Sequence, residues 1–147
     1  MSKPQPAHRS AFGVFRSITT RWMDNDVYGH VNNVTYYSYF DTAVNGFLID
    51  QGLLDIGCGK AIGLVVDTGC SYFASIAFPD EIEIGFKVAR LGNSSVRYEL
   101  GVFRKGEDIA VAQGHFVHVY VDRETRQPIG LEKRARAILE AVSPAAG

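Results

Sequence analysis

The sequence predicts a single α+β domain, in which an antiparallel sheet curves around one long apolar helix. Two observations carry this prediction. One helical pattern with a strongly hydrophobic face stands near the N-terminus, and strand-like alternation fills most of the chain behind it. Strands that are segregated from one dominant helix favour an antiparallel sheet over a parallel α/β arrangement. With 147 residues, of which 46% are hydrophobic and 21% charged, the chain has the size and composition of one domain.

The first element that we expect is a strand from Val14 to Trp22. Val14, Ile18 and Trp22 are an even number of residues apart, so a strand would place them on one face. Threonine and aromatic residues, which favour strands, also occur in this segment. Two early prolines disfavour a helix in residues 1–12, so we expect a flexible N-terminal arm there.

A long helix is expected next. A polar loop rich in turn-forming residues follows the first strand, and Asn32 or Asn33 is a suitable N-cap at its end. Apolar side chains then recur every three or four residues as far as Ile49, and Gly52 ends the helix. The apolar residues of this stripe are Tyr36, Phe40, Ala43, Phe47 and Leu48. A face this hydrophobic has to be covered by another element.

The rest of the chain alternates apolar and polar residues, as strands do. Four strands are expected, over residues 62–72, 82–88, 96–102 and 109–119. Short polar turns at Gly92–Ser94 and Gly106–Asp108 join the last three, which favours an antiparallel meander. A short C-terminal helix is expected over residues 132–142.

These elements place the folded domain at residues 13–142, with a flexible tail over residues 143–147. A curved antiparallel sheet of about five strands, wrapped around the helix, would bury the apolar faces of both. Its edge strands would stay open, and extension of the sheet across a dimer is the usual remedy. We therefore expect a homo-oligomer, either a dimer or a tetramer.

Composition argues against several classes of protein. Fifteen Lys and Arg stand against 16 Asp and Glu, without the basic excess that contacts phosphates, so no nucleic-acid partner is expected. No run of 18 apolar residues occurs, so no membrane partner is expected. Cys58 and Cys70 lack CxxC spacing, and a free buried thiol at Cys70 fits a reduced, cytoplasmic location. His115 and His118 fall on opposite faces of one strand, so no shared metal ion is expected.

The loop from Asp24 to Asn33 is where acidic, imidazole, amide and glycine residues gather before the helix. Unpaired N–H groups at a helix N-terminus can stabilise the oxyanion of an acyl-transfer reaction. A loop carboxylate would then act as base or nucleophile, and Gly29 allows close backbone approach. Asp, Asn and Gly before a helix are also the usual residues of caps and turns. From the residues alone, an acyl-transfer site and a purely structural cap both stay open.

One motif resembles that of a known family. The pattern Asp-x-Asp-x-x-Gly-His-Val-Asn-Asn begins at Asp24, and the aromatic-rich segment Tyr36–Phe40 follows it. This pattern resembles the signature of hotdog-fold acyl-CoA thioesterases. It is most similar to the 4-hydroxybenzoyl-CoA thioesterase-like branch, which includes bacterial long-chain acyl-CoA thioesterases. The expected order of elements is similar to that of a hotdog domain along nearly the whole chain.

The resemblance implies roles for single residues. It places the catalytic carboxylate at Asp26, as general base or nucleophile, and a supporting acid at Asp24. Gly29, His30 and Asn33 are implied to bind the substrate, with the backbone N–H around Asn33 polarising the thioester carbonyl. The histidine looks more like the fatty-acyl members than the aromatic-substrate members. The implied substrate is an acyl-CoA thioester, with coenzyme A as part of that substrate and no separate cofactor.

Two other functions stay open beside thioester hydrolysis. A hotdog hydratase adds water across an enoyl thioester, but its branch resembles Asp-x-Asn-Pro-x-His, with His five residues after Asp. Here His30 follows Asp26 by four residues and no proline intervenes. A non-catalytic acyl-CoA or acyl-carrier binding module has no use for a carboxylate beside the thioester. The sequence therefore predicts hydrolysis of acyl-CoA thioesters.

Overall fold

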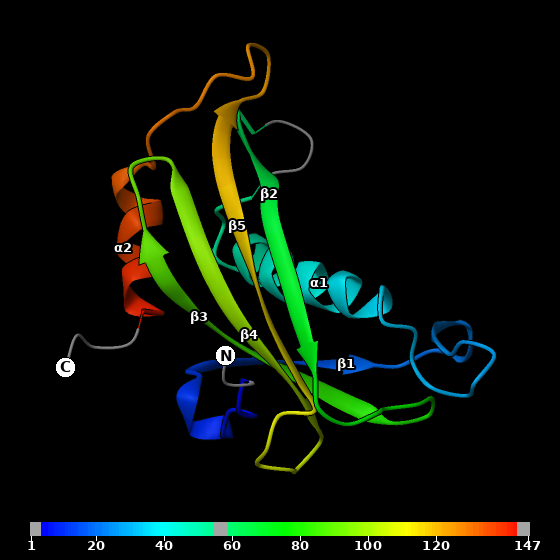
Figure 1. Cartoon of the computed structure of the whole chain (residues 1–147). Helices are drawn as coiled ribbons and strands as arrows, with labels where there is room; N and C mark the ends of the chain where they lie inside the picture. The colour runs from blue at the N-terminus through cyan, green and yellow to red at the C-terminus, as the bar shows by residue number, and fades with distance from the viewer. Residues whose placement is uncertain (1–3, 55–58, 144–147) are drawn as a thin grey trace.

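A computed structural model describes the structure of residues 4–54 and 59–143. Within these residues, five strands form one antiparallel sheet in the order β1-β3-β4-β5-β2 (Figure 1). The strands are β1 (Val14–Thr19), β2 (Ala61–Tyr72), β3 (Glu81–Leu91), β4 (Ser95–Arg104) and β5 (Ala112–Asp122). The helices are α1 (Thr35–Asp50) and α2 (Lys133–Ala141), with short 3-10 turns at Arg9–Ala11 and Trp22–Asp24. The predicted α+β class, the meander and the single hotdog domain are confirmed.

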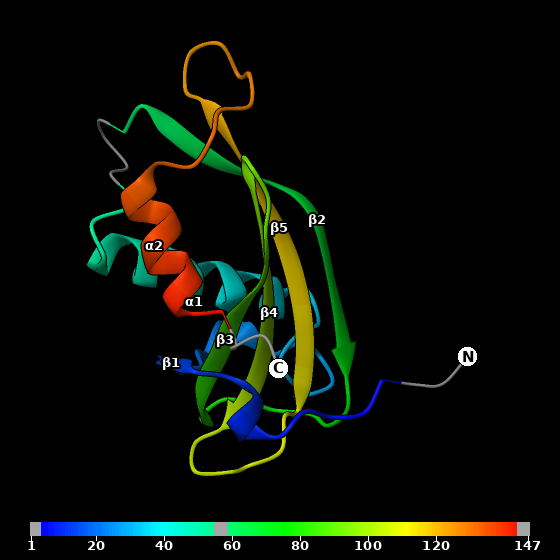
Figure 2. The same ribbon diagram turned by 90° about the vertical axis from the view of Figure 1, so that its left-hand side faces the viewer.

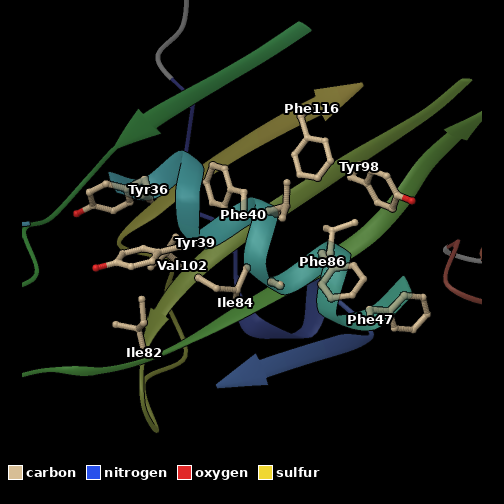
Figure 3. Close-up of a cluster of buried hydrophobic side chains, with 14 of the residues drawn as sticks. Tyr36, Tyr39, Phe40, Phe47, Ile82, Ile84, Phe86, Tyr98, Val102 and Phe116 are labelled. Atoms are coloured by element: carbon tan, nitrogen blue, oxygen red, sulfur yellow. The ribbon is translucent and has the colours of Figure 1, made fainter. Parts of the chain in front are cut away.

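The core lies between the sheet and α1. Figure 2 shows both helices on the concave side of the curved sheet. In Figure 3, aromatic side chains of α1 interleave with apolar side chains of β3, β4 and β5. Phe40 comes so close to β5 that a Cβ on Gly114 would stand 2.7 Å from its ring, so the strand needs glycine there. The apolar helix stripe and the alternating strands thus cover each other, as their patterns predict.

Several element boundaries differ from the predictions by one to three residues. β1 ends at Thr19, because the buried Thr20 side chain donates a hydrogen bond to the carbonyl of Asp80 and the chain then turns. Trp22 therefore lies in a 3-10 turn and is 78% exposed. The helix begins at Thr35, after the predicted caps. β5 begins at Ala112, and Ile109 before it forms an isolated β-bridge with His8 of the N-terminal segment.

Part of the segment expected as a flexible arm has a packed position. Residues 7–12 lie on the face of the sheet opposite α1, where the backbone N–H of Ala7 donates to Oε1 of Gln113 at 2.8 Å. Phe12 is only 9% exposed and packs edge-on against Phe103. Gly101 leaves the space for its ring, since a Cβ there would stand 2.8 Å from it. Residues 1–3 and 144–147, and Cys58, lie outside the described residues.

Candidate active site

The loop between β1 and α1 folds as a small hairpin. Asn25 and Val31 form an antiparallel bridge, and the backbone N–H of Asp26 donates to the carbonyl of His30 at 2.8 Å. Gly29 makes the turn with a φ of 83°, a left-handed conformation that favours glycine. The hairpin brings Asp26, Gly29 and His30 together, and its second arm leads directly into the start of α1. The structure thus gives Gly29 a turn-forming role.

Asp24 is a buried carboxylate whose hydrogen-bonding capacity is used within the protein. Its side chain is 2% exposed. Oδ2 accepts from the backbone N–H of Arg21 at 2.9 Å and from the Tyr39 hydroxyl at 2.8 Å, and Oδ1 accepts from the Arg21 guanidinium at 3.1 Å. Burial alone would raise the pKa of Asp24, but these hydrogen bonds outweigh it and hold the pKa below the ordinary aspartate value. Asp24 is therefore an ionised anchor of the hairpin.

Asp26 has a different environment, although only one residue separates it from Asp24. Its side chain is half-buried, and Oδ1 accepts the backbone N–H of Tyr28 at 2.9 Å. Within residues 4–54 and 59–143, its carboxylate has no other hydrogen bond and no ion pair. One oxygen is thus fixed by the turn, and the other is left for a water molecule or a substrate.

Asn33 lies just before α1, and hydrogen bonds fix the residues on both sides of it. The preceding residue, Asn32, donates its N–H to the carbonyl of Asp24, and its Oδ1 accepts the N–H of Val34. The Asn33 carbonyl accepts the Tyr72 hydroxyl at 3.0 Å. Among the described residues, no acceptor takes the Asn33 N–H, which stands at the positive end of the α1 dipole.

The side chain of His30 is exposed on the hairpin, and no described residue forms a hydrogen bond or an ion pair with it. Its backbone carbonyl, rather than its imidazole, is what contributes to the hairpin. The structure therefore places the imidazole where an incoming molecule can reach it.

The sequence did not predict that two tyrosines of this site form hydrogen bonds with the loop. Tyr39 comes from α1 and Tyr72 from the end of β2, and each donates its hydroxyl to the loop. Aromatic residues at helical spacing indicate core packing, and the rings do pack there. No spacing rule says which oxygen the hydroxyl of a packed tyrosine ring will reach. By contrast, the three-residue spacing of Arg21 and Asp24 is a local signal of their mutual capping.

Exposed apolar side chains surround the loop. Their exposed fractions lie between 62% and 93%, although large hydrophobic residues are more often buried in globular proteins. These residues are Trp22, Met23, Val27, Tyr28 and Val34. A concentration of this kind marks a binding or association surface.

Two other features of the described residues were candidates for a site, a metal-binding cluster and a cavity under the packed arm. No group of three or more His, Cys, Asp or Glu that could hold a metal ion occurs among the described residues. His115 pairs with Asp67 at 3.1 Å, whereas His118 is buried on the other face of β5, as their parity predicts. A cavity of about 280 Å³ lies between the packed arm and the sheet and shares no residue with the loop. Within the described residues, no helix is long and apolar enough to cross a bilayer.

Comparison with solved structures agrees with the fold. The crystal structure of the PA5185 protein from Pseudomonas aeruginosa strain PAO1 is 53% identical, with a TM-score of 0.93, over 98% of this chain and 100% of that chain. A DHNA-CoA thioesterase from Staphylococcus aureus has a TM-score of 0.77 over 86% of this chain and 90% of its own. At its 20% identity, this likeness concerns the fold alone.

Comparison of sequences identifies the family. The protein YsmA of Bacillus subtilis (strain 168), itself uncharacterized, is 25% identical over 122 residues, which are 82% of this chain and 81% of that protein. Residues 20–141 match the family model of the thioesterase-like superfamily. Because this match spans the hairpin, α1 and all strands from β2 to β5, the chain belongs to the thioesterase-like superfamily.

Proposed function

We propose that this protein hydrolyses acyl-CoA thioesters to a free carboxylic acid and coenzyme A, with Asp26 as general base or nucleophile. Membership of the thioesterase-like superfamily supports thioester hydrolysis in general. The observation that carries the choice of residue is the contrast between two neighbouring acids. Asp24 is buried and fully hydrogen-bonded, whereas Asp26 keeps an oxygen without a partner among the described residues.

The proposed reaction begins with the thioester carbonyl at the start of α1. The Asn33 N–H would donate to the carbonyl oxygen and stabilise the negative charge that develops there. As a base, Asp26 would take a proton from water, whose oxygen attacks the carbonyl carbon while the C–S bond breaks and the thiolate leaves. As a nucleophile, Asp26 would form an anhydride with the acyl group and release the thiolate, and water would then hydrolyse the anhydride. Both routes yield the same acid and thiol.

Coenzyme A enters only as part of the substrate, and we propose no separate cofactor. Gly29 and His30 would contact the substrate from the hairpin. We also propose a cytoplasmic homo-oligomer, a dimer or tetramer, which would cover the exposed apolar side chains around the loop and the open edge of β2.

The experiment that tests the proposal measures free thiol released from short-chain, long-chain and aromatic acyl-CoAs. We expect turnover of at least one of them, and a loss of roughly a hundredfold or more in kcat/KM for Asp26→Asn. Asp108→Asn is the matched control, since this acid is 69% exposed and its ion-pair partner is Arg9 rather than a residue of the loop. Binding of acyl-CoA without thiol release from any substrate would overturn hydrolysis and favour a binding module, whereas hydration of an enoyl-CoA would favour a hydratase.

A further inference from the structure

We propose that Tyr72 is a positioning residue, which holds the Asn33 carbonyl and thereby the backbone at Asn33, so that the Asn33 N–H points at the thioester oxygen. This inference rests on the proposed function, because it assigns a role within the same site. Tyr72 lies outside the motif that indicates the family, 39 residues along the chain from Asn33.

The contact joins two elements that are distant in sequence. Tyr72 is the last residue of β2, an edge strand, and its hydroxyl donates to the Asn33 carbonyl at 3.0 Å. Its ring packs edge-on against the ring of Tyr36, with 5.0 Å between the centroids. Since Tyr36 belongs to the first turn of α1, the tyrosine pair fixes the end of β2 to the start of the helix. Both the ring and the hydroxyl of Tyr72 are therefore engaged at the proposed oxyanion site.

Asn33 needs this support because the helix does not supply it fully. The residue precedes the first helical residue, and the only intrahelical-type bond to its carbonyl among the described residues is a long one, 3.4 Å from the N–H of Tyr36. The Tyr72 hydrogen bond is shorter and holds the peptide unit between Asn33 and Val34, which restrains the backbone rotation at Asn33 and so the direction of its N–H. An oxyanion donor has to lie about 2.7–3.1 Å from the reacting oxygen, so a small rotation of Asn33 would weaken the donor.

The Tyr72 hydroxyl is suited to act as a permanent donor. Burial raises the pKa of Tyr72 above the ordinary tyrosine value, and the neighbouring Cys70 acts in the same direction. The phenol therefore keeps its proton across the working range of a hydrolase. Phenylalanine would preserve the packing on Tyr36 and remove only the donor, which makes the position accessible to a clean test.

The test compares Tyr72→Phe with the wild-type protein on the best acyl-CoA of the panel. We expect kcat to fall about tenfold with KM changed less than about twofold, because the donor acts on the transition state rather than on substrate binding. Tyr120→Phe is the control, since it removes a hydroxyl from β5 opposite Gly63, near the end of β2 that is far from Tyr72. A merely structural role would lower the unfolding midpoint and leave kcat per folded molecule unchanged, and that result would overturn the inference.

A second measurement separates this inference from the proposed function. In a 15N-correlation spectrum, the Asn33 amide is expected to shift or broaden in Tyr72→Phe and to stay in place in Tyr120→Phe. An unchanged Asn33 amide would overturn the positioning role even in an active enzyme. Absence of thiol release by the wild-type protein would instead refute the hydrolase proposal, and the catalytic role of Tyr72 would fall with it.

Discussion

The Tyr39 hydroxyl donates a 2.8 Å hydrogen bond to Oδ2 of Asp24, and both residues are buried. This bond ties the second turn of α1 to the hairpin that precedes the helix. Since Arg21 neutralises the same carboxylate from the solvent side, the negative charge of Asp24 is compensated where it is buried. An acid with a structural function thus stands beside Asp26, for which we propose the chemistry.

Asp24→Asn is expected to lower the free energy of unfolding by about 2 kcal/mol, because a buried amide cannot accept all the bonds that the carboxylate accepts. Tyr39→Phe should cost about 1 kcal/mol, the usual value for one hydrogen bond. Chemical denaturation of the purified variants measures both. The Asp26→Asn variant, whose side chain makes one exposed hydrogen bond, should stay within about 0.5 kcal/mol of wild type. An equal loss of stability in both aspartate variants would contradict the division of roles.

His118 is expected to make the protein less stable as the pH falls from 6.5 to 4. Burial lowers the pKa of His118 to about 4, so in this window the unfolded chain binds a proton that the folded chain does not. The stability is complete above pH 6.5 and decreases by about 3 kcal/mol by pH 4, at about 1.4 kcal/mol per pKa unit. His118→Phe removes the titrating group and places a similar ring beside Phe116 and Tyr98.

Denaturation curves at several pH values measure this effect as a difference between the two proteins. The Asp24 contribution is common to both and is lost only below its ordinary pKa of 3.8, outside the window. The stability difference between His118→Phe and wild type should therefore grow steadily from pH 6.5 downward. A difference that is constant with pH would show that His118 takes up its proton in the folded state.

The sequence carried enough information to predict the elements whose patterns are long. The apolar stripe of α1 runs along a 16-residue helix, the alternation in β3 and β4 runs over residues 82–88 and 96–102, and packing follows both. Short segments were less predictable, since the fate of Trp22 depends on the Thr20 contact with Asp80 that ends β1. The packing of the arm depends on glycines of two distant strands, which leave room for Phe12.

The candidate site was predictable in part, for a related reason. The residues of the hairpin are contiguous, so a motif can indicate them, and the resemblance selects Asp26 over Asp24. The different burial of Asp24 and Asp26 could not be deduced, because the loop has no periodic pattern of apolar residues. The contacts of Tyr39 and Tyr72 depend on how α1 and β2 meet the hairpin, which only the tertiary structure gives.

Phe12→Ala is expected to lower the free energy of unfolding by about 2 kcal/mol, since it empties a largely buried site against Phe103 and Gly101. Ile109→Ala is the control near the same arm, because its side chain is 51% exposed and should cost less than about 0.5 kcal/mol. Thermal and chemical denaturation report the loss. If residues 1–12 behaved as a flexible arm throughout, both variants would be equally stable.

The open edge of β2 leads to a prediction about assembly. β2 is 12 residues long, and Leu64, Val65 and Val66 on it are 36%, 47% and 61% exposed. The other edge, β1, has 6 residues and a more polar sequence. An exposed apolar edge with unpaired backbone groups is a template for pairing with a second strand, and charged side chains block such pairing. We therefore expect two copies of the chain to associate through β2, and Val66→Lys to weaken that association.

Light scattering after size-exclusion chromatography measures the molar mass of the protein in solution and so tests this association. Wild type should elute as a multiple of 16.2 kDa, and Val66→Lys should shift toward the 16.2 kDa monomer at the same concentration. Thr19→Lys adds the same charge to an exposed position of β1 and should leave the mass unchanged. If both variants dissociate alike, added charge rather than the β2 edge is responsible. If the wild-type protein itself is a 16.2 kDa monomer, the apolar edge needs another explanation and the proposed oligomer is wrong.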